Sequence, residues 1–197
     1  MNINIMLFDD FETLDAFGPV EILSRIPTHI LKYYSISGGI VTSAQGMKIE
    51  TESICAAKPK GILVLPGGRG TRVLVNDKKF LSCLKNIGEN AIFCLSICTG
   101  SALFAKVGLL DGKAATSNKK AFAWAMSTSN KVKWAKNARW VVDGKFYTSS
   151  GVSAGMDMTL GFVSDQYGLD NALQIAQNIE YIWNSDKELD LFAVKED

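Results

Sequence analysis

The sequence predicts a doubly wound α/β protein, in which helices cover both faces of a mostly parallel sheet. Short apolar runs, such as residues 3–8 and 61–65, suit strands that are buried on both sides. Segments with apolar residues at helical spacing, such as residues 78–89, alternate with these runs. Buried strands that alternate with helices are typical of a parallel sheet between two helical layers.

Each element in the first half of the chain has its own signal. Residues 3–8 form a continuous apolar run, and residues 14–26 carry apolar side chains at helical spacing. Around and after the Gly38-Gly39 pair, the sequence predicts a strand and a hairpin from three strand-like segments, at residues 33–37, 41–43 and 48–51. Residues 61–65 are a second buried strand, which Pro66-Gly67-Gly68 ends.

The second half continues the alternation. Residues 78–89 predict a helix, and a strand that ends at Leu95 leads into another helix that reaches residue 107. Asp143-Gly144 is a type I′ turn signal, and it predicts a small β-hairpin over residues 140–148. Two further helices are expected over residues 153–167 and from residue 169 to about 183.

Composition limits the class of protein. A chain of 197 residues with 47% hydrophobic and 21% charged residues suits a single globular domain over residues 1–197. The net charge of +1 provides no field that would attract nucleic acid or membrane, and a run of lysines between residues 113 and 139 is expected to be a solvated face. No apolar run is long enough to cross a bilayer, and the first residues lack a signal-peptide leader.

The four cysteines and the single histidine show neither disulfide nor metal spacing. We therefore expect reduced cysteines, no metal, no other cofactor and a cytoplasmic location.

Cys98 is the most informative residue. Ser96-Ile97-Cys98-Thr99-Gly100 has the spacing of a nucleophile elbow, where a sharp turn between strand and helix presents one side chain above the sheet. The helix that follows directs unpaired N–H groups at the sulfur, which favours the thiolate. The alternative is a buried core cysteine, and we adopt that interpretation for Cys94.

Two other loops are expected beside Cys98, because ligands of such sheets bind beyond the carboxyl ends of the strands. Gly67 and Gly68 allow the backbone to approach a reacting atom, and their N–H groups, with that of Thr99, are candidate oxyanion donors. A plain glycine turn is the alternative. Phe17, Ile97 and Trp124 are candidates to line the pocket, with a core role as the alternative for each.

Asp15 stands out among the carboxylates that follow the first strand. It lies between Leu14 and Phe17, on the side of the helix expected to pack toward the sheet, where burial would raise its pKa. Such a carboxyl could exchange protons with an adduct on Cys98 or position a water. A helix-capping role is an equal alternative from the local pattern. Asp157, early in a later helix, is interpreted as structural because negative charge there favours the helix dipole.

Several segments together resemble the ThiJ/PfpI superfamily over nearly the whole chain. The matching segments are Leu14-Asp15-x-x-Gly18-Pro19-Val20-Glu21, Leu65-Pro66-Gly67-Gly68, Cys98-Thr99-Gly100-Ser101, residues 108–116 and residues 151–157. The resemblance implies the flavodoxin-like fold of class I glutamine amidotransferases and a homodimer. It is strongest to the branch that holds isonitrile hydratases and sensor-like domains of transcription regulators.

This resemblance implies Cys98 as nucleophile, with Asp15 and Thr99 around the reacting centre. Where the branch usually has a histidine, this chain has Asn118, within Thr116-Ser117-Asn118-Lys119. A peptidase needs that histidine as its base, so we predict no peptidase activity and expect Asn118 to line the pocket.

The leading hypothesis is a hydratase-like lyase that adds water to a small, largely apolar electrophile such as an isonitrile. It would yield an N-substituted formamide. Three alternatives stay open: a redox or stress-response protein with an oxidation-sensitive Cys98, a non-catalytic binding module for small molecules, and a glyoxalase-type enzyme.

Overall fold

A mostly parallel sheet forms the centre of the molecule. The structure, a computed structural model, describes residues 1–58 and 60–193. Neighbouring strands pair in parallel within the described sheet, except at its two edges, where the outermost strands run antiparallel. In spatial order, the strands are β3 (Gly39–Thr42), β4 (Lys48–Ser53), β2 (Ile30–Ser35), β1 (Asn2–Met6), β5 (Ile62–Leu65), β6 (Phe93–Ser96), β10 (Phe146–Ser149) and β9 (Trp140–Asp143).

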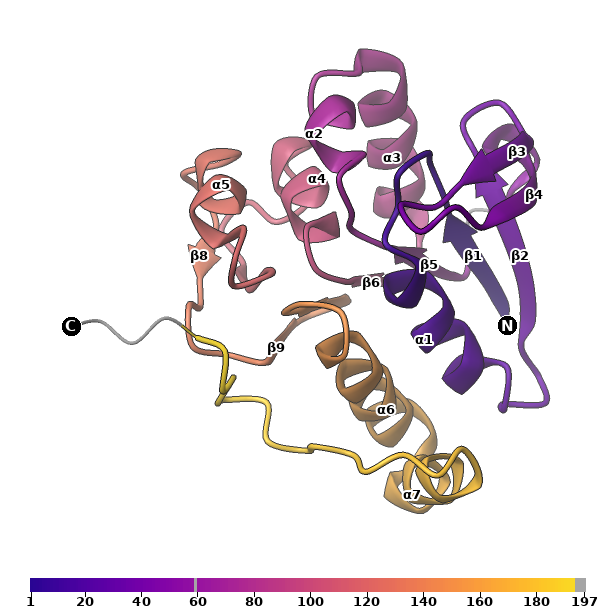
Figure 1. Cartoon of the computed structure of the whole chain (residues 1–197), viewed down its shortest axis with the longest axis vertical. Coiled ribbons are helices and arrows are strands. Elements are labelled where there is room, and N and C mark those ends of the chain that lie inside the picture. The colour runs from indigo at the N-terminus through magenta and orange to yellow at the C-terminus, as the bar shows by residue number, and fades with distance from the viewer. Residues whose placement is uncertain (59, 194–197) are drawn as a thin grey trace.

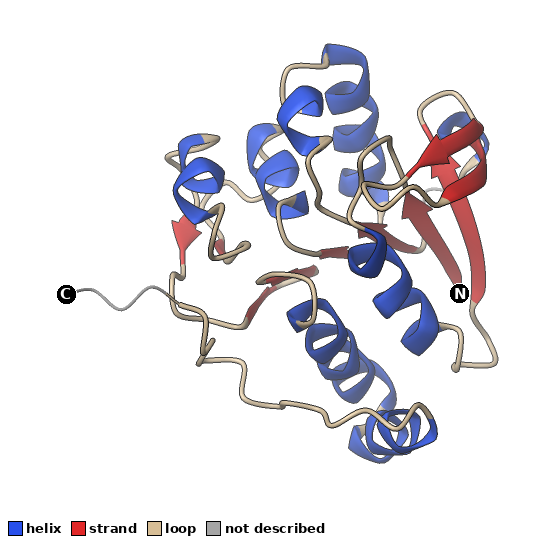
Figure 2. Cartoon of the chain, viewed as in Figure 1, coloured by secondary structure: helices blue, strands red, loops and turns tan. Residues whose placement is uncertain are grey.

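Helices cover both faces of this sheet (Figure 2). In Figure 1, α1, α6 and α7 lie below the strands, whereas α2, α3 and α4 lie above them. A short pair of strands, β7 (Ala114–Ala115) and β8 (Lys133–Trp134), stands apart from the main sheet. The helices are α1 (Thr13–Leu23), α2 (Thr71–Leu74), α3 (Lys78–Asn90), α4 (Gly100–Lys106), α5 (Phe122–Ser127), α6 (Ala154–Tyr167) and α7 (Leu169–Asn178), with a 3₁₀ turn at Ile54–Ala56. The architecture confirms the predicted fold class.

The order of the strands places a switch point between β1 and β5. From β1 the chain builds outward through β2 and β4, then returns to the other side of β1 and continues through β5, β6 and β10. The loops that follow the neighbouring strands β1 and β5 therefore lead in opposite directions and leave a crevice between them. In open α/β sheets, ligands bind in such a crevice. A bridge between Phe11 and Gly68, and a hydrogen bond from the Glu12 N–H to the Gly67 carbonyl (2.9 Å), hold the two loops together.

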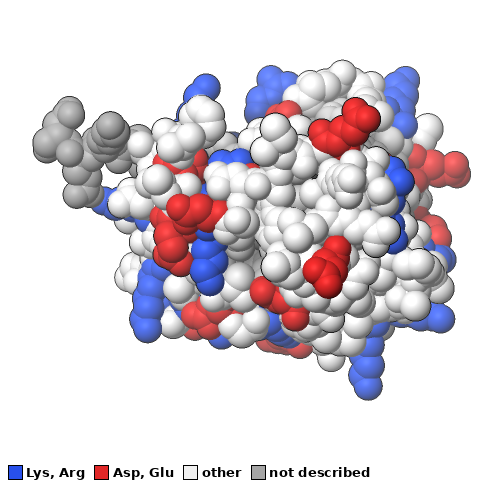
Figure 3. All heavy atoms as spheres, turned by 90° about the horizontal axis from the view of Figure 1, so that it is seen from below, with Lys and Arg blue, Asp and Glu red and all other residues white. Residues whose placement is uncertain are grey.

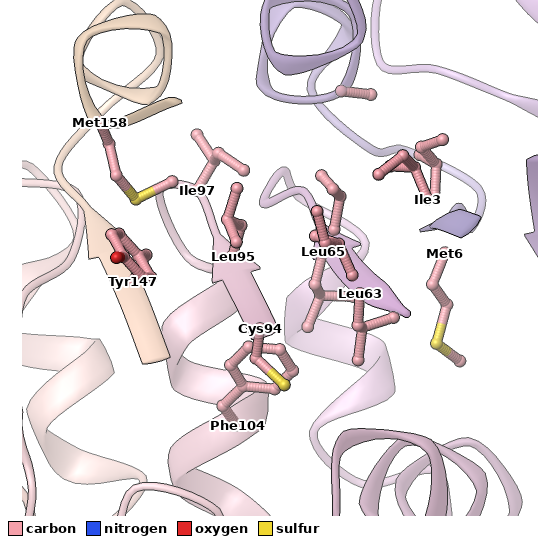
Figure 4. Close-up of a cluster of buried hydrophobic side chains, with 14 of the residues drawn as sticks. Ile3, Met6, Leu63, Leu65, Cys94, Leu95, Ile97, Phe104, Tyr147 and Met158 are labelled. Carbon is pink, nitrogen blue, oxygen red and sulfur yellow. The ribbon is translucent and has the colours of Figure 1, made fainter. Parts of the chain in front are cut away.

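Apolar side chains fill both sides of the central strands. In Figure 4, Phe104 from α4 lies with Cys94 on one side of β6, and Met158 from α6 lies near Tyr147 and Ile97 on the other. These side chains are at most a few per cent exposed. Cys94 is therefore the core cysteine that the sequence predicts.

The β9–β10 hairpin forms where expected, but its predicted turn type is wrong. Asp143 stays in the strand opposite Phe146, because its carboxylate accepts hydrogen bonds from the Ala114 N–H (2.9 Å) and the Lys113 ammonium (3.3 Å). The two-residue loop is thus Gly144-Lys145, and only Gly144 has a positive φ (62°). A type I′ turn needs positive φ at both positions, so this geometry is that of a type II′ turn.

The last helix is shorter than predicted. The apolar pattern continues to Trp183, but α7 ends at Asn178. Glu180 adopts a left-handed φ of 52°, and the Tyr181 N–H turns back to the Ala176 carbonyl (2.9 Å). The chain reverses there because Tyr181 and Trp183 bind Asp157 of α6 instead of continuing the helix. The short helices α2 and α5 were not predicted from the sequence.

Charges of both signs are interspersed on the face shown in Figure 3, and neither sign forms a continuous field there. Within the described part of the chain, no helix combines the length and apolar character needed to span a bilayer.

Candidate active site

Cys98 occupies a strained turn between β6 and α4. Its φ is 56°, in the left-handed region, where a residue with a side chain costs about 1–2 kcal/mol. The backbone is crowded around it, since a Cβ at Gly100 would lie 2.5 Å from the Leu65 carbonyl oxygen. The Cys98 N–H donates to the Ser150 carbonyl (3.1 Å), which fixes the turn against the loop after β10. A residue without a side chain at Gly100, two positions after Cys98, is therefore a steric requirement of this turn.

The Cys98 side chain is nearly buried, with 7% of the residue exposed. Burial raises the pKa of the Cys98 thiol above its ordinary value, and the Asp15 carboxylate raises it further. The Thr99 N–H and hydroxyl act in the opposite direction but do not offset these two causes. The Thr99 N–H at the start of α4 favours the thiolate, as the sequence predicts, but desolvation by the surrounding core outweighs it.

Asp15 lies in the first turn of α1 and points inward, with no exposed surface. Its Oδ2 accepts a hydrogen bond from the Gly67 N–H (3.0 Å), and its carboxyl interacts with the Cys98 thiol. Among the described residues, no N–H or O–H donor reaches Oδ1. Burial raises the pKa of Asp15 to about 7, despite the Gly67 hydrogen bond, which lowers it. The structure thus places Asp15 beside the sulfur and not in a capping position.

Gly67 and Gly68 position the site instead of offering free donors. The Gly67 N–H is engaged by Asp15, and the Gly68 N–H donates to the Thr99 hydroxyl (3.1 Å). Of the expected oxyanion donors, only the Thr99 N–H faces the sulfur. A Cβ on Gly67 would lie 2.5 Å from the Thr99 nitrogen and 2.9 Å from the Cys98 Cβ. Gly67 is therefore needed for the close approach of the two loops.

Substituting alanine for Gly67 is expected to push the two loops apart. Overpacking costs about 1–3 kcal/mol of unfolding free energy, and we expect the displaced thiol to be alkylated faster at pH 8. Denaturant unfolding and alkylation of the Cys98 peptide, followed by mass spectrometry, would measure both. Gly39→Ala is the control, since nothing lies within 4 Å of the added Cβ and only backbone strain results. An unchanged alkylation rate in Gly67→Ala would contradict the steric role.

A cavity of about 220 Å³ opens onto the sulfur. Its lining residues come from the loops after β1, β5, β6 and β10, from α2 and from the segment before α5: Glu12, Gly68, Arg69, Arg72, Cys98, Thr99, Asn118 and Val152. The lining combines charged and polar side chains with apolar surface, and a largely apolar substrate stays a prediction.

The predicted pocket residues divide into two groups. Asn118 lines the cavity, and its Oδ1 accepts a hydrogen bond from the Ala121 N–H (3.1 Å) ahead of α5. Phe17 does not line it; its ring packs on Phe11 and Tyr33, at centroid distances of 6.4 and 6.2 Å. Ile97 is fully buried against Gly155. For Phe17 and Ile97 the pocket expectation is wrong, because both side chains face away from the sulfur into packed layers.

Four residues of this lining, Glu12, Arg69, Arg72 and Val152, were not predicted from the sequence. Arg69 directly follows the Pro-Gly-Gly turn and Arg72 comes three residues later, so their position after a strand end was the available signal. His29 lies elsewhere: its Nδ1 contacts the Leu23 carbonyl (2.8 Å) and its Nε2 contacts the Tyr167 hydroxyl (2.7 Å). The chain has one histidine, and it is already engaged.

The fold and the site together define a class: doubly wound α/β proteins with a cysteine and a buried carboxyl paired at the switch point of the sheet. The model of the DJ-1/PfpI family matches residues 1–165, and the chain belongs to that family.

Relatives within the family differ in what their names describe. An isonitrile hydratase of Pseudomonas putida is 28% identical over 187 residues, covering 92% of this chain and 78% of that protein. The HTH-type transcriptional regulator CdhR of Pseudomonas aeruginosa is 25% identical over 83% of this chain, which spans only 49% of the regulator. Among solved structures, a ThiJ/PfpI family protein from Pseudomonas syringae superposes with a TM-score of 0.80 at 26% identity, covering 91% of this chain and 74% of that one.

Proposed function

We propose that this protein is a cysteine-dependent hydratase-like enzyme, which adds water to a small electrophile of the isonitrile type. The observation that carries the proposal is the Cys98–Asp15 pair, in which Cys98 lines a small cavity, Asp15 is fully buried beside the sulfur, and no histidine base is present among the lining residues described. Similarity to an isonitrile hydratase supports the same chemistry. The turn at Cys98 would act as a nucleophile elbow.

The pair can move one proton through the whole reaction. At neutral to alkaline pH it holds a single proton, because the pKa of Asp15 is about 7 and that of the Cys98 thiol is raised well above it. Asp15 accepts the thiol proton as the sulfur attacks the terminal carbon of the isonitrile, and then delivers the proton to that carbon. The product of this step is a thioimidate, with a C–S bond formed and no group lost.

Water completes the turnover. Asp15, again ionised, takes a proton from a water that adds to the thioimidate carbon and passes this proton to the nitrogen. Collapse of this adduct breaks the C–S bond, moves the remaining hydroxyl proton through Asp15 to the sulfur and releases an N-substituted formamide. The Thr99 N–H, which faces the sulfur, would stabilise negative charge there in both steps.

The site residues oppose two other activities. Proteolysis needs a base that also protonates an amine leaving group, and Asn118 cannot fill that role at the position where the family resemblance implies a histidine. A redox sensor is favoured by an exposed thiolate of low pKa, whereas Cys98 is nearly buried and burial and Asp15 raise the pKa of its thiol. Hydration uses the thiol and carboxyl as they stand.

Turnover of a panel of small isonitriles by the purified protein tests the proposal. We expect formamide production, its complete loss in Cys98→Ala, and a kcat/KM that rises with pH through about 7. The rise follows the ionisation of Asp15, because below that pH both members of the pair are protonated and no base is present. Absence of turnover with every isonitrile, or turnover that survives Cys98→Ala, would refute the proposed function.

A cytoplasmic homodimer that acts on a small molecule stays a prediction for this chain. Analytical ultracentrifugation of the purified protein would measure the oligomeric state.

A further inference from the structure

Arg72 is a cation in the cavity whose charge no carboxylate offsets. The Cζ of its guanidinium lies over the indole of Trp124, 3.3 Å from the ring centroid, and one nitrogen makes a long contact with the Thr71 hydroxyl (3.4 Å). Within the described part of the chain, no ion pair joins Arg72 to an acidic side chain. Stacking holds the plane of the guanidinium and leaves N–H groups at its edge for a planar, bidentate acceptor.

The other two charged side chains of this cavity, Arg69 and Glu12, are not stacked cations without a counter-charge. Arg69 is largely exposed and lies 3.7 Å from Asp10. Glu12, the one acidic side chain of the lining, accepts a hydrogen bond from Gln45 (2.8 Å) and makes no ion pair with Arg72. The cavity therefore presents one oriented and uncompensated positive group on the same lining as the sulfur of Cys98.

Two of the three cations of the neighbouring cavity are already engaged. That cavity, of about 350 Å³, shares Asn118 and Val152 with the first and contains Lys119, Lys120 and Arg139. The Lys119 ammonium donates to the Thr116 hydroxyl and the Ala138 carbonyl, and Arg139 is paired with buried aspartates. Lys120 is exposed and does not line the cavity of Cys98, so the cation that an anion beside the sulfur meets is Arg72.

We infer that the substrate is a small electrophile carrying a carboxylate, which Arg72 binds while the reacting carbon meets the Cys98 sulfur. The volume of about 220 Å³ lies below the roughly 300–1,000 Å³ of sites for drug-sized ligands, so the two ends of the substrate are a few bonds apart. The inference rests on the proposed function only in stating which reaction the bound substrate undergoes. The binding of an anion beside Cys98 can be tested without any turnover.

Alkylation by two reagents of nearly equal shape isolates the charge. Iodoacetate carries a carboxylate and iodoacetamide does not, and both require the thiolate, so the ratio of their rates is independent of the thiol pKa. In the wild-type protein we expect this ratio at Cys98 to exceed that at the exposed Cys55 about tenfold. Mass spectrometry of the separate cysteine peptides measures both ratios in one sample. Equal ratios at the two cysteines would overturn the inference, and this comparison needs no variant.

Substitution then assigns the effect to one residue. Arg72→Gln should lower the iodoacetate to iodoacetamide ratio at Cys98 about tenfold and leave the ratio at Cys55 unchanged. Arg69→Gln is the matched control, because it removes the same charge from the same cavity without a stacked guanidinium, and we expect less than a twofold change. A ratio that Arg72→Gln leaves intact, or that Arg69→Gln lowers equally, would contradict the assignment.

Turnover gives a separate comparison. Isocyanoacetate should be a better substrate than 2-isocyanoacetamide, and Arg72→Gln should raise KM for the carboxylate alone. If neither compound is turned over while the alkylation ratios behave as expected, the hydratase proposal fails and the anion site stands. If both are turned over equally well and Arg72→Gln leaves both KM values unchanged, the anion site fails and the hydratase proposal stands.

Discussion

Asp15→Asn is expected to lower isonitrile turnover about 10²–10⁴-fold, the usual effect of losing a general acid–base group. The same substitution should make Cys98 easier to alkylate at pH 8. The ionised carboxylate of Asp15 raises the pKa of the thiol, so its removal lowers that pKa and increases the thiolate fraction. Turnover and thiol reactivity should therefore change in opposite directions. Initial rates of formamide production and the pH dependence of Cys98 alkylation measure the two effects.

Glu12→Gln is the control for this experiment. Glu12 also raises the pKa of Asp15 through its charge, yet it interacts with Gln45 and not with the thiol. We expect its substitution to lower the midpoint of the pH–rate profile and to retain most of the turnover. A purely structural role of Asp15 predicts that turnover and alkylation both change little, or that both change together with unfolding. Either result would remove Asp15 from the mechanism.

The strand ends and the Cys98 turn could be predicted from sequence because they depend on local requirements. Buried strands need apolar runs, and a turn with Cys98 at a φ of 56° needs small neighbours such as Gly100. The proximity of Asp15 to the sulfur also followed from its place on the inner side of the helix after β1. These features are set by a few residues next to each other in the chain and by the topology of the sheet.

The state of the thiol could not be predicted in the same way. Its pKa depends on how completely the core excludes water from Cys98 and on the distance to Asp15, and neither is encoded in the residues that flank the cysteine. The N–H groups of Gly67 and Gly68 illustrate the same limit. The sequence shows that these two N–H groups could donate hydrogen bonds to a substrate. Only the packed structure shows that they already donate to the Asp15 carboxyl and the Thr99 hydroxyl.

Asp157 shows how a correct general interpretation can miss the physical cause. Sequence indicated a structural acid that favours the α6 dipole. The structure buries it completely, where it accepts hydrogen bonds from Arg139 (2.6 Å), from the Tyr181 hydroxyl and from the Asn184 N–H (both 3.0 Å). These partners lie outside α6, in segments that no local pattern links to it. Asp157 therefore fastens the chain after α7 to the body of the protein.

Arg139→Met is expected to lower the free energy of unfolding by about 3–5 kcal/mol at pH 8. The side chain of Arg139 is 9% exposed and pairs with Asp157 (2.6 Å) and Asp190 (3.8 Å), both of which are almost fully buried. Methionine preserves much of the packing but leaves two carboxylates without a counter-charge. Urea unfolding at pH 8 measures the loss, and Lys113→Met is the control. Lys113 and Asp143 form a partly exposed pair at 3.3 Å, whose loss should cost at most about 1 kcal/mol.

The pH dependence of this loss of unfolding free energy distinguishes the contribution of the Arg139 charge from that of its packing. Without Arg139, burial raises the pKa of Asp157 in the folded variant further above its unfolded value, because the opposing charge is gone. Stability is therefore lost as pH rises past the ordinary aspartate pKa of about 4, and the deficit relative to wild type should be smaller at pH 5 than at pH 8. Adding Asp157→Asn to Arg139→Met removes one of the uncompensated charges, so the double variant should recover part of the loss at pH 8. A deficit that is equal at both pH values, and that the second substitution does not reduce, would mean that Arg139 acts through its hydrocarbon chain and not through its charge.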